Sequence, residues 1–483
     1  MDSTLKSTAV LMSGRLTGVV VAFCIPVVLT RVLDQSAFGT YKQLFLIYAT
    51  LYGIAQIGMA ESLFYFLPAN PARAGRFALN SLLALIGSGA ACLAGLWLGR
   101  GRIAAWIGND ALAEGLPWIG LYLALMLAST GLEIVLISRK RFVGAAAIYA
   151  GSDVVRTALS LLPLLMTRSL EGVLIGGASF AAVRFATTCL LLRREFGADF
   201  RVDGALLKSQ LAYAIPFELA VVFEILQANL HQYAVSLHFD AAAFAVYSVG
   251  CLQVPLVDLV AGTSCNVMMV KMGEDLKSGR PAEALAAWHG TVRKLAWVFF
   301  PMVVVLLVNA RDLIVFLFTA SYAASVPVFM VWTISFLLLA LPVDGVLRVF
   351  ADTRSLFLIG GTKLLIIGLA VGWFLARFHL LGGVLVTLLA TLLGKTLALA
   401  RVKHHMRVGL LGLLPWGGLA ATLGCAVAAG LPALLVREHL GLPPLASIVV
   451  SGLVYAMVYA ALAGGFRSAG LRRRLGALLE AQR

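Results

Sequence analysis

The amino-acid sequence predicts an all-α integral membrane protein of about fourteen transmembrane helices. The 483 residues are 61% hydrophobic and 13% charged, whereas soluble domains contain about 45–50% apolar and about 25% charged residues. The charged residues form short islands, separated by apolar stretches of about 20 residues, the length that crosses a bilayer as a helix. No polar stretch is long enough to form a soluble domain.

Hydropathy windows of about 19 residues place the spans in two groups of six and a final pair. The first group covers residues 8–29, 41–67, 77–98, 115–138, 144–166 and 171–192. The second covers residues 209–238, 241–270, 292–318, 324–349, 355–376 and 380–400, and the pair covers 411–436 and 445–465. These groups predict an N-terminal lobe (1–200), a second lobe (201–407), two additional helices (408–466) and a basic cytoplasmic tail (467–483).

A short repeat lies near the start of each group of six. Three residue types recur at the same spacing, in VLDQSAFGTYKQ as Asp34, Phe38 and Tyr41, and in LHFDAAAFAVYSV as Asp240, Phe244 and Tyr247. Since an even number of spans separates the copies, both halves share one orientation in the membrane, and we expect two pseudo-symmetric lobes around a central cavity. Asp34 is expected to cap the following helix, and Gly39 to permit close packing between spans.

The formal net charge of +15 does not indicate nucleic-acid binding, because the basic residues lie between spans and form no solvated domain with interleaved aromatics. With the N-terminus inside, Lys and Arg favour the cytoplasmic side by roughly three to one, as the positive-inside rule expects. Both termini are therefore expected in the cytoplasm. The six cysteines lie in apolar segments without a CxxC pair, so we expect packing residues and not disulfides or metal ligands.

A 40-residue segment, 29–68, carries a recognisable series of residues. In order, they are Leu33, Phe38, Gly39, Tyr41, Gly53, Gly58, Ala60, Phe64, Tyr65 and Phe66. The segment resembles the N-terminal signature of the polysaccharide transport family, the Wzx-like O-antigen and exopolysaccharide flippases. This family belongs to the multidrug/oligosaccharidyl-lipid/polysaccharide (MOP) exporter superfamily. The second repeat departs from the pattern where Ala245 stands in place of Gly39.

The resemblance implies transport of undecaprenyl-diphosphate-linked oligosaccharide across the bacterial inner membrane by alternating access. The cargo would be the repeat unit of an O-antigen, a capsule or an exopolysaccharide. Membrane lipids and the polysaccharide polymerase and chain-length machinery are the partners that it implies, and no cofactor is expected. The resemblance does not name the sugar.

Five basic residues lie inside predicted spans: Arg15, Arg156, Arg184, Lys363 and Lys395. An ionisable group at bilayer depth costs about 2.5–3.5 kcal/mol on insertion, so each is expected to face protein or a wet cavity. In a hydrated cleft they could hold a diphosphate while the polyprenyl tail stays in lipid. Alternatives stay open, since Arg156 can pair with Asp153 and the two lysines can reach the interface. Arg184 has no acidic partner one turn away, and Glu133 is expected to reach water.

The seventh span is the most polar. Glu224, Gln227 and His231 recur at i, i+3 and i+7, which predicts one polar stripe, and Glu218 lies nearby. Asp258 in the eighth span is a further candidate. Titratable groups at this depth suit coupling to H⁺ or Na⁺, because protonation removes a buried charge. Polar contact between helices is the alternative.

Three other functions compete with the flippase hypothesis. A MATE-like drug or cation antiporter would share the fold, but the cationic set disfavours cationic cargo. A glycan polymerase or ligase would need outer loops large enough for a catalytic site, and these loops are short; no P-loop appears either. A flippase for lipid II, the peptidoglycan precursor, would differ only in cargo.

Overall fold

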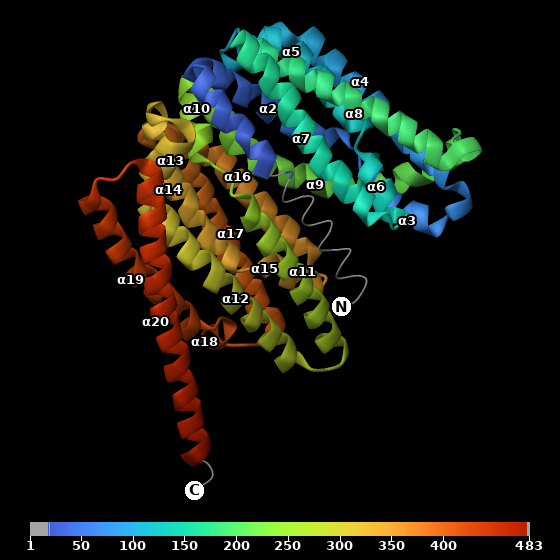
Figure 1. Cartoon of the computed structure of the whole chain (residues 1–483). Coiled ribbons are helices and arrows are strands. Elements are labelled where there is room, and N and C mark those ends of the chain that lie inside the picture. The colour runs from blue at the N-terminus through green and yellow to red at the C-terminus, as the bar shows by residue number, and fades with distance from the viewer. Residues whose placement is uncertain (1–17, 19, 481–483) are drawn as a thin grey trace. The chain divides into compact units, whose positions relative to one another are not determined.

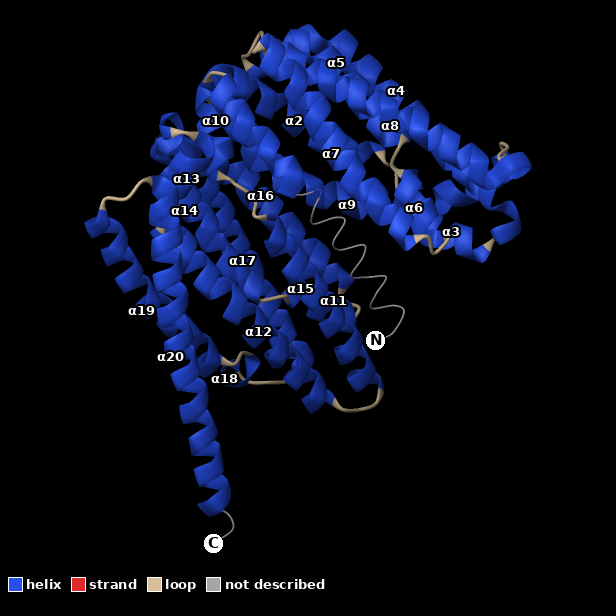
Figure 2. Ribbon diagram, viewed as in Figure 1, coloured by secondary structure: helices blue, strands red, loops and turns tan. Residues whose placement is uncertain are grey.

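The computed structural model describes residue 18 and residues 20–480, except for the side chains of residues 217, 220, 255, 256 and 465–480. In this part of the chain all regular structure is helical, and short loops join the helices (Figures 1 and 2). The chain separates into two compact units, which end at Ser248 and begin at Val249. This division is not the predicted division into pseudo-symmetric lobes, whose boundaries at residues 201 and 408 stay predictions.

Unit 1 contains the helix Val20–Val32 and the α-helices α2 (Gln35–Ala55), α3 (Met59–Ala69), α4 (Ala74–Ile107), α5 (Leu112–Ala128), α6 (Gly131–Ser138), α7 (Phe142–Thr167), α8 (Leu170–Phe196) and α9 (Gly204–His238). Helix α10 (Ala241–Gly250) crosses the boundary. Unit 2 contains α11 (Pro255–Lys277), α12 (Pro281–Val308), α13 (Ala310–Phe318), α14 (Val326–Ser335), α15 (Val343–Val349), α16 (Thr353–Phe378), α17 (Leu380–Met406), α18 (Leu410–Leu413), α19 (Trp416–Leu440) and α20 (Pro444–Glu480). Short 3₁₀ turns complete the units: η1 (Pro71–Arg73), η2 (Gly197–Asp199), η3 (Ala320–Ser325) and η4 (Phe336–Ala340).

Many of these helices can cross a bilayer. In the described residues, 11 helical segments are long and apolar enough, and 12 if the bent α9 counts as one span. The prediction of a polytopic all-α membrane protein is thus confirmed, while the count of fourteen stays a prediction. The predicted first span lies largely outside the described residues. The predicted eighth span is divided, because α10 ends at Gly250 and α11 restarts at Pro255, a residue suited to the first turn of a helix.

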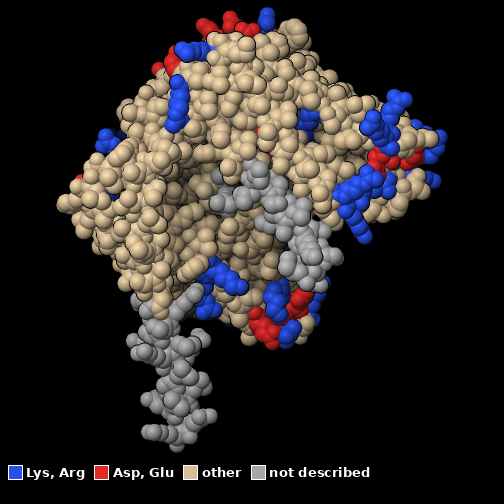
Figure 3. Space-filling model, viewed as in Figure 1, with Lys and Arg blue, Asp and Glu red and all other residues tan. Residues whose placement is uncertain are grey.

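The outer faces of the helices are apolar, as a lipid environment requires. On the face drawn in Figure 3, most Lys, Arg, Asp and Glu side chains gather near helix ends, and broad apolar surface lies between them. Large apolar side chains on this outer surface include Leu98, Leu369, Trp373 and Met457, all more than half exposed. Their exposure would be unfavourable in water and is expected in hydrocarbon.

The start of α2 has the structure that the sequence predicts. The Asp34 carboxylate accepts a 2.7 Å hydrogen bond from the Ala37 N–H and caps the helix. In the second copy of the repeat, the Asp240 carboxylate accepts a 2.8 Å hydrogen bond from the Ala243 N–H. Gly39 packs so closely on the Ala241 backbone that an added Cβ would overlap the Ala241 carbonyl. Both the predicted cap and the predicted close packing are confirmed.

Two interruptions meet inside unit 1. Helices α2 and α3 are separated by a break in which Ile57 and Gly58 both take positive φ, at 51° and 64°. Helix α9 bends by 47° at Pro216, which cannot donate a backbone hydrogen bond. The two sites touch, because a Cβ on Gly58 would lie 2.6 Å from the Ala214 carbonyl oxygen.

In unit 2 the last two helices are joined to α13 by a half-buried polar link. Helix α19 packs on α12, and α20 packs on α19 and α13; in Figure 1, α20 also extends past the end of α19. The Asp312 carboxylate on α13 accepts from Arg437 Nε on α19 and from Ser447 Oγ on α20, both at 2.8 Å. Arg437 also donates to the Val308 carbonyl at 2.9 Å.

Candidate functional site

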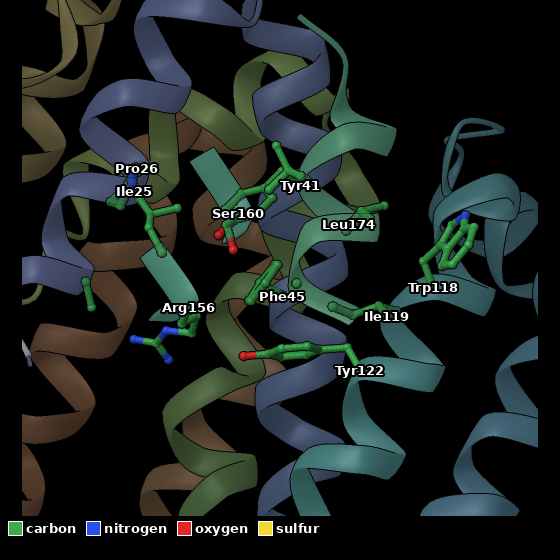
Figure 4. A pocket seen from close by; sticks show the side chains of 13 residues that line it. Ile25, Pro26, Tyr41, Phe45, Trp118, Ile119, Tyr122, Arg156, Ser160 and Leu174 are labelled. Carbon is green, nitrogen blue, oxygen red and sulfur yellow. The ribbon is translucent and has the colours of Figure 1, made fainter. Parts of the chain in front are cut away.

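Unit 1 encloses a cavity of about 170 Å³ with an aromatic wall and one cationic side chain (Figure 4). It is lined by residues of the helix Val20–Val32 and of α2, α5, α7 and α8: Ala22, Ile25, Pro26, Tyr41, Phe45, Trp118, Ile119, Tyr122, Arg156, Ser160, Val173, Leu174 and Gly177. Four side chains offer hydrogen bonds, namely Tyr41, Tyr122, Arg156 and Ser160. An amphipathic ligand with a polar group near Arg156 would suit this lining.

Two aromatic residues of the cavity lining, Tyr41 and Phe45, begin an aromatic row on one face of α2. Tyr41, Phe45, Tyr48 and Tyr52 follow at intervals of four, three and four residues, which places them in one row. Their successive ring centroids are 4.4, 5.7 and 5.4 Å apart. Tyr122 of α5 joins the row, with its centroid 4.9 Å from that of Tyr48. The sequence analysis missed this row, although its helical spacing was a usable signal.

Arg156 is paired with Asp153, which is one of the two alternatives that the sequence left open for this residue. Its guanidinium lies 2.7 Å from the Asp153 carboxylate one turn earlier on α7. The Tyr122 hydroxyl points toward Arg156 in Figure 4. Arg156 Nε is buried and has no hydrogen-bond partner among the described residues. Arg156 therefore belongs to a local ion pair and lines the cavity as well.

Arg184 has an acidic partner that the sequence does not reveal. Its guanidinium donates to the Glu133 carboxylate of α6 at 2.6 Å and to Ser152 Oγ of α7 at 2.7 Å. The exposed fractions of the two charged side chains are 12% and 4%. The expectation that Glu133 reaches water was wrong, because the carboxylate is buried against the guanidinium. Since Ser152 lies one turn before Arg156, the guanidinium of Arg184 from α8 contacts α7 one turn away from Arg156.

The two predicted lysines come together in unit 2. Lys395 Nζ of α17 lies 3.0 Å from the Asp344 carboxylate of α15 and donates to the Leu341 carbonyl at 3.1 Å. Lys363 of α16 packs beside Gly394, and its charge and that of Arg348 also act on Asp344. One ion pair, Lys395 with Asp344, thus lies within the influence of two further positive charges.

Similarity to solved structures identifies the fold. Lipid II flippase MurJ, in an inward closed conformation, aligns with a TM-score of 0.74 and 11% identity over 97% of this chain and 100% of that chain. An inward-facing multidrug resistance MATE transporter of the MOP superfamily aligns with a TM-score of 0.58 and 13% identity, over 81% of this chain and 99% of that one. A eukaryotic MATE transporter aligns with a TM-score of 0.54 and 13% identity, over 88% of this chain and 100% of that chain.

The sequence profile of the family described as "Polysaccharide biosynthesis protein" matches residues 4–255, more than half of the chain. The chain belongs to this polysaccharide biosynthesis family. Together with the fold, this confirms a MOP superfamily exporter, as the N-terminal signature indicated. Among curated protein sequences, none matches the chain.

In this polysaccharide biosynthesis family member, the polar residues of α9 differ in burial. Glu224 is exposed, whereas His231 is buried and its Nδ1 lies 2.6 Å from the Tyr247 hydroxyl of α10. Glu218 is buried beside the break between α2 and α3. Asp258 is exposed in the first turn of α11. Glu224 and His231 share one face of the straight part of α9 but lie in different surroundings along its length.

The five predicted cations therefore have three different outcomes in this family member. Arg156 and Arg184 lie together in unit 1, each with a carboxylate, and Lys363 and Lys395 lie together in unit 2. Arg15 lies outside the described residues. No group of three or more His, Cys, Asp and Glu side chains suited to a metal ion occurs among the residues that the structure describes.

Proposed function

We propose that this chain is a flippase that moves undecaprenyl-diphosphate-linked oligosaccharide across the bacterial inner membrane by alternating access. The cargo is the repeat unit of an O-antigen, a capsule or an exopolysaccharide. Membership of the polysaccharide biosynthesis family and the MOP fold support a transporter rather than an enzyme. The observation that carries the proposal is the cationic cluster at Asp344, where Lys395 forms an ion pair and the charges of Lys363 and Arg348 also act.

A diphosphate suits this cluster because its charge exceeds that of the single carboxylate. Lys395 already donates to Asp344, and Lys363 and Arg348 bring two further positive charges to the same place. Ammonium and guanidinium groups form short, charge-assisted hydrogen bonds with phosphate oxygens. The Asp344 side chain is 55% exposed, so a phosphate group can approach the cluster from outside.

The arginines of unit 1 have a different part in the proposal. Arg156 and Arg184 are each within 2.7 Å of a carboxylate, so their charges are largely balanced. The cavity beside Arg156 offers aromatic faces and hydroxyl groups from Tyr41, Tyr122 and Ser160. Such a lining can exchange hydrogen bonds with sugar hydroxyls. Arg15 stays a candidate for phosphate binding.

Two other cargoes remain in competition. Lipid II is favoured by the similarity of the fold to lipid II flippase MurJ. A drug or cation antiporter is favoured by the similarity to MATE transporters, but three cations around one carboxylate would repel cationic drugs.

The proposal further places both termini in the cytoplasm, includes coupling to H⁺ or Na⁺, and has the polysaccharide polymerase and chain-length machinery as partners.

Oriented inner-membrane vesicles test the proposal. Undecaprenyl-diphosphate-linked glycan is measured on each face, with and without the gene, by lectin binding and mass spectrometry. We expect deletion to trap the glycan on the cytoplasmic face. A glycan distribution that deletion leaves unchanged contradicts the proposal, and the same vesicles then receive lipid II and a cationic dye.

The variant K363A/K395A tests the cationic cluster in the same vesicles. Losing one charge-assisted hydrogen bond costs about 1.5–3 kcal/mol, so we expect flipping to slow by at least about tenfold. The matched control is Lys403→Ala, an exposed lysine on the same helix as Lys395. Flipping at the wild-type rate in the double variant would remove the cluster from the mechanism.

A further inference from the structure

The cavity of unit 1 presents two hydroxyl groups that bond no other residue of the described chain. Tyr41 of α2 and Ser160 of α7 line it and are 8% and 5% exposed. Neither hydroxyl group forms a hydrogen bond with another described residue. Buried polar groups are almost always hydrogen-bonded, because leaving one unsatisfied is costly. The cavity therefore offers two hydrogen-bonding positions to an occupant.

Three aromatic rings contribute to the cavity lining (Figure 4). The Phe45 ring centroid lies 4.4 Å from that of Tyr41 and 6.0 Å from that of Tyr122. The π face of an aromatic ring is electron-rich and attracts the positive C–H edges of a group that packs on it. The C–H-bearing face of a sugar ring suits such a surface.

Aliphatic side chains make up much of the remaining lining. Ile25 and Pro26 come from the helix Val20–Val32, and Val173 and Leu174 come from α8. A hydroxyl group placed against these side chains would lose its bonds to water without replacement. A methyl group would gain free energy from the same contact. An occupant with both hydroxyl and methyl groups fits this lining best.

The charge of the cavity is balanced. Arg156 is its cationic side chain, and its guanidinium lies 2.7 Å from the Asp153 carboxylate. An anionic or a cationic occupant would compete with one member of this pair for the other, and breaking such a pair is unfavourable away from water. A neutral occupant leaves the pair intact.

The volume of the cavity, about 170 Å³, limits the size of the occupant. Pockets for drug-sized ligands measure about 300–1,000 Å³. This cavity is smaller, so it suits one sugar ring and not a repeat unit of several sugars.

The lining residues gather toward one end of unit 1. Those of α2, α5 and α8 belong to the first half of the spans Gln35–Ala69, Leu112–Ser138 and Leu170–Asp199, and those of α7 to the second half of Phe142–Thr167. Since successive spans run in opposite directions, these halves lie at the same end, that of Asp34 and of the loop between α7 and α8. With both termini in the cytoplasm, as proposed above, this end faces outward.

We propose that this cavity binds one neutral sugar ring of the cargo, a ring that carries a methyl group as an N-acetyl or a 6-deoxy substituent. The face of the ring packs on the aromatic side chains, its hydroxyl groups bond Tyr41 and Ser160, and its methyl group contacts the aliphatic lining. The site lies toward the outer face and holds the sugar there before release. This proposal rests on the proposed function, because the sugar belongs to the lipid-linked oligosaccharide.

Isothermal titration calorimetry on the purified full-length protein in lipid nanodiscs tests the site with free sugars. N-acetylglucosamine and 6-deoxyglucose each differ from glucose, the third probe, at one carbon. We expect at least one of the two methyl-bearing sugars to bind about tenfold more tightly than glucose, whose hydroxyl group would face the aliphatic lining. Equal affinity for glucose would contradict the methyl requirement. Absence of binding by all three sugars would overturn the proposal.

Three variants test whether the sugar binds in the cavity. Tyr41→Phe and Ser160→Ala each remove one hydroxyl group and should raise the Kd about three- to tenfold. Gly177→Leu should abolish binding, because Gly177 lines the cavity and its Cβ would have room at 3.7 Å from Tyr122, so the longer side chain fills the space. The matched control Ser179→Ala, an exposed serine of α8, should leave the Kd unchanged.

A melting curve of each variant confirms that it is folded. Wild-type affinity in all three cavity variants would show that the sugar binds elsewhere and would overturn the proposal. The titrations use free sugars and no transport, so a cavity that binds no sugar and a chain that flips no glycan in vesicles are separate results.

Discussion

The guanidinium of Arg184 lies 2.6 Å from the carboxylate of Glu133, and 51 residues separate the two along the chain. Both side chains are almost fully buried. Taking two such charges out of water is costly, and the pair repays this cost only while both members are present. The interior of unit 1 therefore depends on each partner.

Glu133→Ala should strongly destabilise the protein, because it leaves the Arg184 charge buried without its partner. Breaking a buried pair from one side costs about 3–5 kcal/mol. Thermal unfolding in detergent, followed by tryptophan fluorescence, measures the loss. The double variant E133A/R184L should recover part of it, since the orphan charge is gone. If the double variant is no more stable than Glu133→Ala, the unpaired Arg184 charge is not the cause of the lost stability.

Gly39→Val should disrupt the start of α2. Its side chain would overlap the backbone of Ala241, which cannot move aside as a flexible side chain could. Overpacking of this kind costs about 1–3 kcal/mol or more, and the melting temperature should fall accordingly. Gly87→Val is the matched control, because Gly87 of α4 has open space around it. Similar melting temperatures for the two variants would contradict the close approach.

Asp312→Ala should loosen α19 and α20 from the rest of unit 2. The carboxylate holds Arg437 of α19 and Ser447 of α20 at once, and a hydrogen bond to a charged group contributes about 1.5–3 kcal/mol. Hydrogen exchange in α19 and at the start of α20 should rise while that of α12 stays unchanged. Glu438→Ala, an exposed carboxylate beside Arg437, serves as the control and should have no effect. Unaltered exchange in Asp312→Ala would show that apolar packing alone fixes these helices.

Asp352 should give the protein a stability that is lost in acid. Hydrogen bonds from His405 and Arg401 hold the pKa of the Asp352 carboxyl well below its usual range. A carboxyl group whose pKa is lower in the folded state stabilises the fold above its unfolded pKa, about 3.9, and this contribution disappears as pH falls toward the folded pKa. Melting temperature against pH should thus fall more steeply in acid for wild type than for Asp352→Asn.

Asp110→Asn is the matched control for that measurement, because Asp110 is exposed in unit 1. It should keep the acid dependence of wild type. If Asp352→Asn also keeps it, the carboxyl group at the start of α16 does not set the acid response.

Local features were predictable from the sequence, and contacts between distant segments were not. The Asp34 cap, the close packing at Gly39 and the division into apolar helices follow from residue type and spacing over a few positions. The family resemblance rested on the same stretch of chain and is confirmed over the first half of the protein. Each of these features depends on short-range geometry.

The candidate site is different, because its members come from separate helices. Arg184 has no acidic neighbour on α8, and only the packing of α6 against α8 brings Glu133 to it. On α9, packing that varies along the helix places Glu218 and His231 in the interior and Glu224 on the surface. Such arrangements depend on the tertiary fold, which periodicity within one helix does not contain.

The cap at Asp34 also determines which changes of chain length unit 1 can accept. Since the helix begins there, every later side chain of α2 takes its direction from the number of residues that follow Asp34. One residue inserted before Tyr41 would turn the row of Tyr41, Phe45, Tyr48 and Tyr52 by about 100° around the helix axis and move Tyr41 and Phe45 away from the cavity wall. We therefore expect this stretch to diversify by substitution, while insertions and deletions accumulate in loops such as the one between α4 and α5.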